Sequence, residues 1–263
     1  MFRTGRSLPA ADEDARQPSG AERVRTLVAG NASAVLVIPG CESSERAPAT
    51  VDARAVSPSG DVLLLLPVGS PATRAATHAT ADEVTAVMEI TDVAPVAVPH
   101  RIRGRGWVAG WLTHVPEAER PAALALLADE RPGLPEPGPG AALLRLEVGE
   151  AYTDDLWGAE HVEPEDFAEA APDPLARHEA ELLQHLAASH GSQLRSLCAL
   201  VGDRGACAGW QRVVPLGLDR FGLRVRFCAA DACFDARFEF PHPVTGIPGL
   251  RTAIRHLFDA AGA

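Results

Sequence analysis

Lysine is absent from this 263-residue sequence, so all 24 of its Lys and Arg positions are arginine. A chain without lysine cannot form a Schiff base, use a lysine general base or bind phosphate with a Walker-type loop. The net charge of −11 argues against a nucleic-acid partner, because affinity for nucleic acids depends on cations that neutralise phosphates. The acidic residues are also concentrated, since no arginine lies between Arg145 and Arg177.

Long apolar runs and cysteine pairs are missing as well. No stretch approaches the ~20 apolar residues that a membrane-spanning helix needs, which argues against a membrane partner. Residues 1–20 lack the apolar run of a secretory signal, and we expect them to form a disordered polar leader. The five cysteines show no CxxC spacing, and we interpret them as reduced thiols of a cytoplasmic protein.

The chain does contain a regular series of β-type segments. Aromatic residues make up only 5% of the sequence, so its core has to consist mainly of Ala, Val and Leu. Segments of this kind occur with short turns and small helices between them, which favours an antiparallel barrel over residues 21–155. The predicted strands are 32–38, 50–56, 61–68, 83–90, 100–115 and 141–153, and the predicted helices are 21–31, 70–79 and 116–131.

The pattern changes after residue 155. We expect an acidic linker over 156–172 and a separate α+β domain over 173–263. This domain has the predicted order α-α-β-β-β-α, with helices at 174–190, 193–201 and 248–260 and strands at 213–218, 223–228 and 232–240. The predicted fold class is α+β.

Two motifs in the second half carry a resemblance to a known family. His185-Leu186-Ala187-Ala188-Ser189-His190 keeps both histidines of a His-Met-Asn-x-Asp-His run, and Phe240-Pro241-His242-Pro243 keeps a strand-Phe-Pro-x-Pro-helix ending. The region resembles the small α+β domain of unknown function in HugZ-like haem-utilisation proteins. Segments 50–56 and 106–112 resemble the pyridoxamine-phosphate-oxidase-like FMN-binding split barrel.

This resemblance implies an antiparallel split β-barrel that forms a homodimer, followed by the small α+β domain, with a planar tetrapyrrole or flavin bound near the subunit interface. Family members that use FMN bind its phosphate through basic and hydroxyl groups in a segment that corresponds to 65–80. Here that segment offers only Ser70, Thr73 and Arg74, so FMN is less expected than haem.

The most informative local pattern is the run Arg101-Ile102-Arg103-Gly104-Arg105-Gly106-Trp107-Val108-Ala109-Gly110-Trp111. On one unbroken strand, side chains alternate between faces, so Arg101, Arg103, Arg105, Trp107 and Trp111 share a face. Arginine forks bind carboxylates and indoles cover planar rings, which suits a haem or flavin ligand. The alternative is a solvated strand whose tryptophans lie in a dimer or domain interface.

Two histidines are candidate ligands for haem iron. His242 lies between two prolines that restrict the backbone, and neutral imidazole suits iron. His190 is the second candidate. Because a five-residue spacing rotates side chains by about 140° on a continuous helix, we expect His185 and His190 not to bind one ion together. The alternative for each histidine is a structural role at the surface.

No catalytic constellation is evident, because the sequence lacks a Gly-x-Ser-x-Gly elbow, an HExxH motif and a strand-linked GxGxxG loop. The sequence leaves three functions open. The first is a haem-binding split-barrel protein for haem storage, trafficking or sensing, with weak haem degradation as an extension. The second is an FMN- or F420-type oxidoreductase, and the third is a ligand-free dimeric interaction protein. Whether the chain is an enzyme stays open.

Overall fold

The computed structural model describes residues 16–39, 49–79, 84–134, 137–201, 209–230 and 232–262. The chain forms two compact units. The barrel unit comprises Pro18–Val93 and Ile102–Asp173. The C-terminal unit comprises the described residues 16–17, 94–101 and 174–262. Segment 94–101 was expected to be part of the barrel, and residues 1–15 of the expected leader lie outside the described residues.

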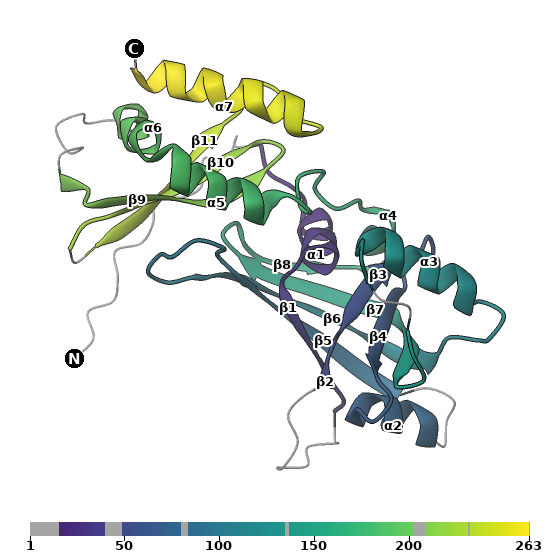
Figure 1. Cartoon of the computed structure of the whole chain (residues 1–263). Helices are drawn as coiled ribbons and strands as arrows, with labels where there is room; N and C mark the ends of the chain where they lie inside the picture. The colour runs from purple at the N-terminus through teal and green to yellow at the C-terminus, as the bar shows by residue number, and fades with distance from the viewer. Residues whose placement is uncertain are drawn as a thin grey trace, which may run out of the picture. The chain divides into compact units, whose positions relative to one another are not determined.

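The barrel unit contains an antiparallel eight-stranded sheet with four helices (Figure 1). Its strands are β1 Ser33–Val37, β2 Ala49–Thr50, β3 Ala53–Val56, β4 Val62–Pro67, β5 Val84–Val93, β6 Ile102–His114, β7 Ala141–Asp155 and β8 Gly158–Val162. Its helices are α1 Gly20–Ala29, α2 Pro71–His78, α3 Arg120–Glu130 and α4 Pro164–Glu169.

The two ends of this sheet are consecutive in the chain, which closes it into a barrel. The strand order is β2-β1-β5-β6-β7-β4-β3, with β8 added on β7. Between β2 and β3, the Val51 amide donates to the Ala34 carbonyl (3.3 Å) and the Asp52 amide to the Leu65 carbonyl (3.0 Å). One short segment therefore bridges β1 and β4. The predicted fold class, α+β with an antiparallel split barrel, is confirmed.

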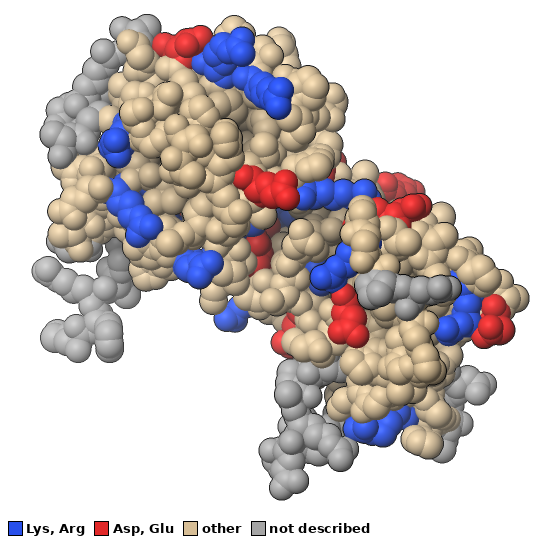
Figure 2. Space-filling model, in the orientation of Figure 1, with Lys and Arg blue, Asp and Glu red and all other residues tan. Residues whose placement is uncertain are grey.

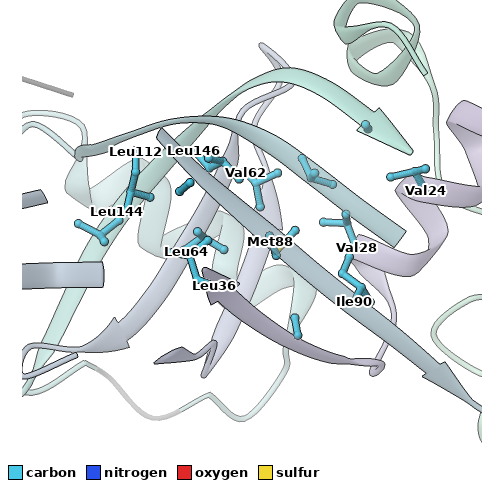
Figure 3. Close-up of a cluster of buried hydrophobic side chains, with 14 of the residues drawn as sticks. Val24, Val28, Leu36, Val62, Leu64, Met88, Ile90, Leu112, Leu144 and Leu146 are labelled. Atoms are coloured by element: carbon cyan, nitrogen blue, oxygen red, sulfur yellow. The ribbon is translucent and has the colours of Figure 1, made fainter. Parts of the chain in front are cut away.

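The barrel core is aliphatic and includes one side of α1 (Figure 3). A capping box starts this helix, because Ser19 accepts from the Glu22 amide while the Glu22 carboxylate accepts from the Ser19 amide. Val24 and Val28 are fully buried on the helix face that packs against the core. The largest side chains that they join from the strands are Leu36, Leu64, Leu66, Met88, Ile90, Leu112, Leu144 and Leu146.

Strand β4 is buried on both of its faces, which explains its uninterrupted apolar sequence. Val62, Leu64 and Leu66 belong to the core described above, whereas Leu63 and Leu65 belong to a second cluster. Helix α3 covers that second cluster with Ala123 and Leu127.

The expected acidic linker at 156–172 is instead part of the barrel unit. Strand β8 pairs with β7 from Ala151↔Val162 to Asp155↔Gly158, and Phe167 of α4 is fully buried in the core. Beyond α4, the Asp173 amide donates to the Thr26 hydroxyl (2.8 Å). The prediction was wrong because the acidic side chains occupy exposed positions, while Val162 and Phe167 between them point inward.

The C-terminal unit has a three-stranded antiparallel sheet of order β11-β10-β9. Its elements follow the predicted order, and their bounds are α5 Glu179–Ser189, α6 Gly191–Ser196, the 3-10 helix η1 Leu197–Leu200, β9 Arg212–Asp219, β10 Gly222–Cys228, β11 Cys233–Glu239 and α7 Ile247–Gly262. None of the helices in the described ranges is long and apolar enough to cross a membrane.

The prediction of free thiols is wrong for this unit. Cys228 and Cys233 are paired in register at the end of the β10–β11 hairpin and form a disulfide. Cys198 is disulfide-bonded as well. The four intervening residues place both cysteines directly opposite each other on a short hairpin. Cys41 and Cys207 lie outside the described residues.

Candidate functional site

Strand β6 separates its side chains onto two faces, as the sequence predicts. Its pairing with β5 is continuous from Gly104 to Leu112, so the alternation is unbroken there. Arg105 and Trp111 are exposed, Trp107 is half-buried and the Arg103 side chain is largely buried, whereas every second residue from Gly104 to Leu112 is buried.

Arg101 does not share this face. The strand begins at Ile102, and Arg101 belongs to the segment 94–101 of the C-terminal unit. Its Nη2 donates to the Ala94 carbonyl (3.0 Å), across the loop that joins β5 to β6. The alternation of faces does not extend to Arg101, because the pairing of β5 with β6 has a register irregularity between Asp92 and Val93, opposite the start of β6.

The two remaining arginines of the run differ in whether the guanidinium group can bind a ligand. The side chain of Arg103 is only 9% exposed, and its Nη2 forms an ion pair with the Asp92 carboxylate (2.8 Å). Breaking such a buried pair leaves an uncompensated charge, so Arg103 is committed to Asp92. Arg105 is exposed and lies opposite Thr91 on β5 and Asp154 on β7.

The tryptophans form an aromatic face together with Tyr152, a residue that the sequence analysis did not single out. The Trp107 and Tyr152 rings lie 5.5 Å apart across β6 and β7, and Trp111 is 42% exposed. Trp111 packs over Gly149, where a Cβ would come within 2.9 Å of the indole. The alternation of buried Ala151 and Thr153 with exposed Tyr152 on β7 could have identified the third ring.

Carboxylates surround the aromatic face. Glu89 lies opposite Trp107, Glu147 opposite Trp111 and Asp154 opposite Arg105, and all three are exposed. Glu150 follows on β7 opposite Ala109. The face therefore carries one available arginine and several acids. On the side of the molecule drawn in Figure 2, the arginines are likewise scattered among acidic side chains.

The predicted iron ligands both lie in the C-terminal unit. His242 is exposed between Pro241 and Pro243. His190 follows the last residue of α5, and its Nδ1 is buried without a hydrogen-bond partner among the described residues. An imidazole at an irregular backbone position, with one nitrogen still unsatisfied, is a candidate ligand.

The histidines at 185 and 190 are closer together than expected. Their rings lie 5.2 Å apart at an interplanar angle of 72°, and the Phe258 ring is 5.9 Å from that of His190. The premise of a continuous helix fails, because α5 ends at Ser189 and His190 has φ −124° and ψ 29°, outside helical geometry. The expectation that the two histidines do not bind one ion together stays a prediction. In the described ranges, however, no group of three or more His, Cys, Asp or Glu side chains could hold a metal ion.

The hydroxyls of the segment that corresponds to a flavin phosphate site are engaged within the fold. Ser70 caps α2 by accepting from the Thr73 amide (3.1 Å), and the Thr73 hydroxyl donates to the Pro67 carbonyl (3.1 Å). Both side chains are buried. Arg74 donates to the Gly69 carbonyl. These contacts stabilise the start of α2 and leave little for a phosphate.

Comparison with solved structures supports the fold. No known protein family and no curated protein matches the sequence. A haem-binding protein from Mycobacterium smegmatis is 21% identical, with a TM-score of 0.61 over 94% of this chain and 99% of that one. A protein of unknown function from Agrobacterium tumefaciens is 16% identical, with a TM-score of 0.42 over 90% and 95% of the two chains. An FAD- and haem-binding protein from M. smegmatis is 18% identical, with a TM-score of 0.39 over 56% and 76%.

Proposed function

We propose that this chain binds haem and serves haem storage, trafficking or sensing. The observation that carries the proposal is an exposed aromatic face with an available arginine beside it, Trp107, Trp111 and Tyr152 with Arg105. The similarity in fold to a haem-binding protein over nearly the whole of both chains supports it. So does the resemblance of the second half to HugZ-like proteins.

The residues present meet part of what haem requires. Indole rings cover a porphyrin and a guanidinium binds a propionate, and Trp107 and Arg105 of the barrel unit supply one of each. An imidazole binds iron, and His242 of the C-terminal unit is the candidate for that role. Arg103 is occupied by Asp92, whereas Arg101 is exposed and, among the described residues, donates only through Nη2, to the Ala94 carbonyl. When bound, haem would supply a redox-active iron.

A haemin titration followed by visible absorption tests the proposal. We expect a Soret band that saturates at one haemin per chain and decreases in Trp107→Ala and Arg105→Ala. Arg251→Ala, which removes an exposed arginine from α7, serves as the control. A parallel titration with FMN and F420 should show no binding. Saturable flavin binding without haemin binding would favour an oxidoreductase.

The second candidate is a ligand-free dimeric interaction protein, and the carboxylates around the aromatic face favour it. Glu89, Glu147 and Asp154 oppose the approach of propionates, whereas apolar rings inside a polar rim are typical of protein interfaces. Both candidates require a homodimer built on the barrel. Light scattering should therefore give about twice 27.7 kDa, and Trp111→Arg should reduce this to the monomer mass. A dimer that binds no haemin would support the second candidate, and a wild-type monomer would contradict both.

A cytoplasmic location stays part of the proposal, but the cysteines no longer support it. The disulfide between Cys228 and Cys233 is of the kind found in oxidising compartments. Fractionation of the native cells, followed by thiol labelling of the extracted protein, would test the location and the oxidation state together.

A further inference from the structure

A cavity of about 530 Å³ opens in the barrel unit where the sheet closes on itself. Its wall includes the C-terminal end of α1, the start of β1, the residues around β2 and β3 and the end of α3. The polar side chains in this wall are Asn31, Ser33, Thr50, Arg54, Glu130 and Arg131. A volume of this size is within the range of small-molecule sites. The proposed haem site does not use any of these residues.

Arg54 is a lining residue of the cavity that is held firmly by hydrogen bonds. Its Nε donates to the Val28 carbonyl (2.7 Å), and its Nη2 donates to the carbonyls of Leu27 (3.1 Å), Gly30 (2.9 Å) and Ala32 (2.8 Å). The bonds to Leu27 and Val28 satisfy carbonyls that α1 leaves unpaired at its C-terminal end, and those to Gly30 and Ala32 hold the segment that follows it. In the part of the chain that the structure describes, Nη1 makes no hydrogen bond. A rigid guanidinium therefore keeps two unused N–H donors.

Arg131 brings a second positive charge to the same cavity. Its Nη1 donates to the Asp52 carbonyl, and its side chain is otherwise exposed. Burial lowers the pKa of Arg54 to about 10, and the charge of Arg131 acts in the same direction. Two like charges that repel each other across a cavity are stabilised by an anion between them. Glu130 in the wall offsets one of the two charges, so the wall stays positive overall.

We propose that this cavity binds a small anion through Arg54 and Arg131, with a phosphate or carboxylate group between the two guanidiniums. Arginine is suited to both groups because its planar fork donates two parallel hydrogen bonds. The hydroxyls of Ser33 and Thr50 and the amide of Asn31 then contact the uncharged part of the ligand. The site is specific for a small polar metabolite rather than for a flat aromatic cofactor, because the described wall contains no aromatic ring.

Calorimetric titration of the full chain with inorganic phosphate, and separately with succinate, tests this site. The ionic strength is held constant with chloride, and haemin is left out, so the result is independent of the haem proposal. We expect saturable binding of at least one of the two anions at one site per chain. The preferred anion identifies the group that the cavity recognises.

Variants connect the binding to the cavity. Arg131→Gln should weaken binding roughly tenfold to a hundredfold, because a charge-assisted contact is lost. Thr50→Val should weaken it severalfold without a change of charge. Arg212→Gln is the matched control, since Arg212 is also exposed and donates to one backbone carbonyl, that of Ala97 in the C-terminal unit.

Three results would overturn the proposal. They are no saturable binding of either anion, equal affinity in wild type and Arg131→Gln, and an equal loss in Arg212→Gln and Arg131→Gln. An equal loss in both variants would indicate that anion binding depends only on the net charge of the protein.

Discussion

The barrel unit and the C-terminal unit are stabilised by different kinds of contact. In the barrel, a ring of strands encloses an aliphatic core in which Phe167 is the aromatic member. The smaller sheet of the C-terminal unit has stacked Phe227 and Phe234 rings (5.0 Å), with Trp210 4.7 Å from Phe234. It also has a cross-strand disulfide, whereas largely buried arginine–carboxylate pairs occur in both units. A three-stranded sheet encloses little volume, so stacked aromatic rings and a covalent cross-link supplement its core.

The largest effect is expected for a core truncation in the barrel. Leu64 is fully buried at the centre of the aliphatic cluster, and Leu64→Ala should lower the free energy of unfolding by about 2–5 kcal/mol. Urea unfolding followed by circular dichroism measures this. Leu200→Ala, at a position 40% exposed in the C-terminal unit, should cost much less. Equal losses would contradict the assignment of the core.

The next effect concerns the ion pair that ties loop 94–101 to the small sheet. Arg226 Nε and Nη2 bind Asp235 (2.6 and 2.8 Å), and Nη1 donates to the Pro99 (2.7 Å) and His100 (2.9 Å) carbonyls. Arg226→Ala leaves the Asp235 carboxylate, which is only 13% exposed, without this partner and should cost about 2–3 kcal/mol. The double variant Arg226→Met with Asp235→Leu should cost less, because no charge is stranded. A double variant as unstable as the single one would show that the carbonyl contacts dominate.

The sequence predicted the barrel better than the contacts of the small sheet, for a physical reason. Burial leaves an apolar pattern, uninterrupted in β4 and partly alternating in β7, which is why these strands were found with nearly correct bounds. A disulfide or an ion pair depends on which residues lie opposite each other, and Cys228 and Asp235 show this only once β10 and β11 are in register. Strand β8 was missed because its first four residues are exposed and Val162 is its one buried residue.

The same reason explains the partial success at the candidate site. Alternation placed Arg103, Arg105, Trp107 and Trp111 on one face, but it could not show that Asp92 neutralises Arg103. Tyr152 was missed because its ring contact, Trp107, lies on another strand, and the sequence alone does not show which residues of two strands lie opposite each other.

Removal of the disulfide is expected to have a moderate effect confined to the C-terminal unit. Cys228→Ala with Cys233→Ala should lower the free energy of unfolding by about 2 kcal/mol, the value expected for a short closed loop. Thermal unfolding by calorimetry measures the loss. Reductant should lower the unfolding temperature of this variant less than that of wild type. An unchanged unfolding temperature would mean that the cross-link contributes nothing to the sheet.

The smallest effect is a pH dependence in the barrel unit. Burial raises the pKa of Asp155 above its ordinary value of 3.8, although Arg23 acts in the opposite direction. The folded state then binds the proton more tightly than the unfolded state, so the contribution of Asp155 to stability decreases as the pH rises above about 4. As the pH rises above about 4, wild type should therefore lose stability relative to Asp155→Asn. Urea titrations at a series of pH values measure it, and a shift in favour of wild type would contradict the raised pKa.

Haemin ligation by the C-terminal histidines tests the central proposal most directly. An axial imidazole determines the ligand field of the iron, so His242→Ala should shift the Soret band and weaken haemin binding, with His190→Ala as the second position to change. His256→Ala, which removes an exposed histidine from α7, should retain the wild-type spectrum. The proposal predicts that one of the two variants, His242→Ala or His190→Ala, has an altered Soret spectrum and that His256→Ala does not. Wild-type spectra and affinities in both variants would contradict it.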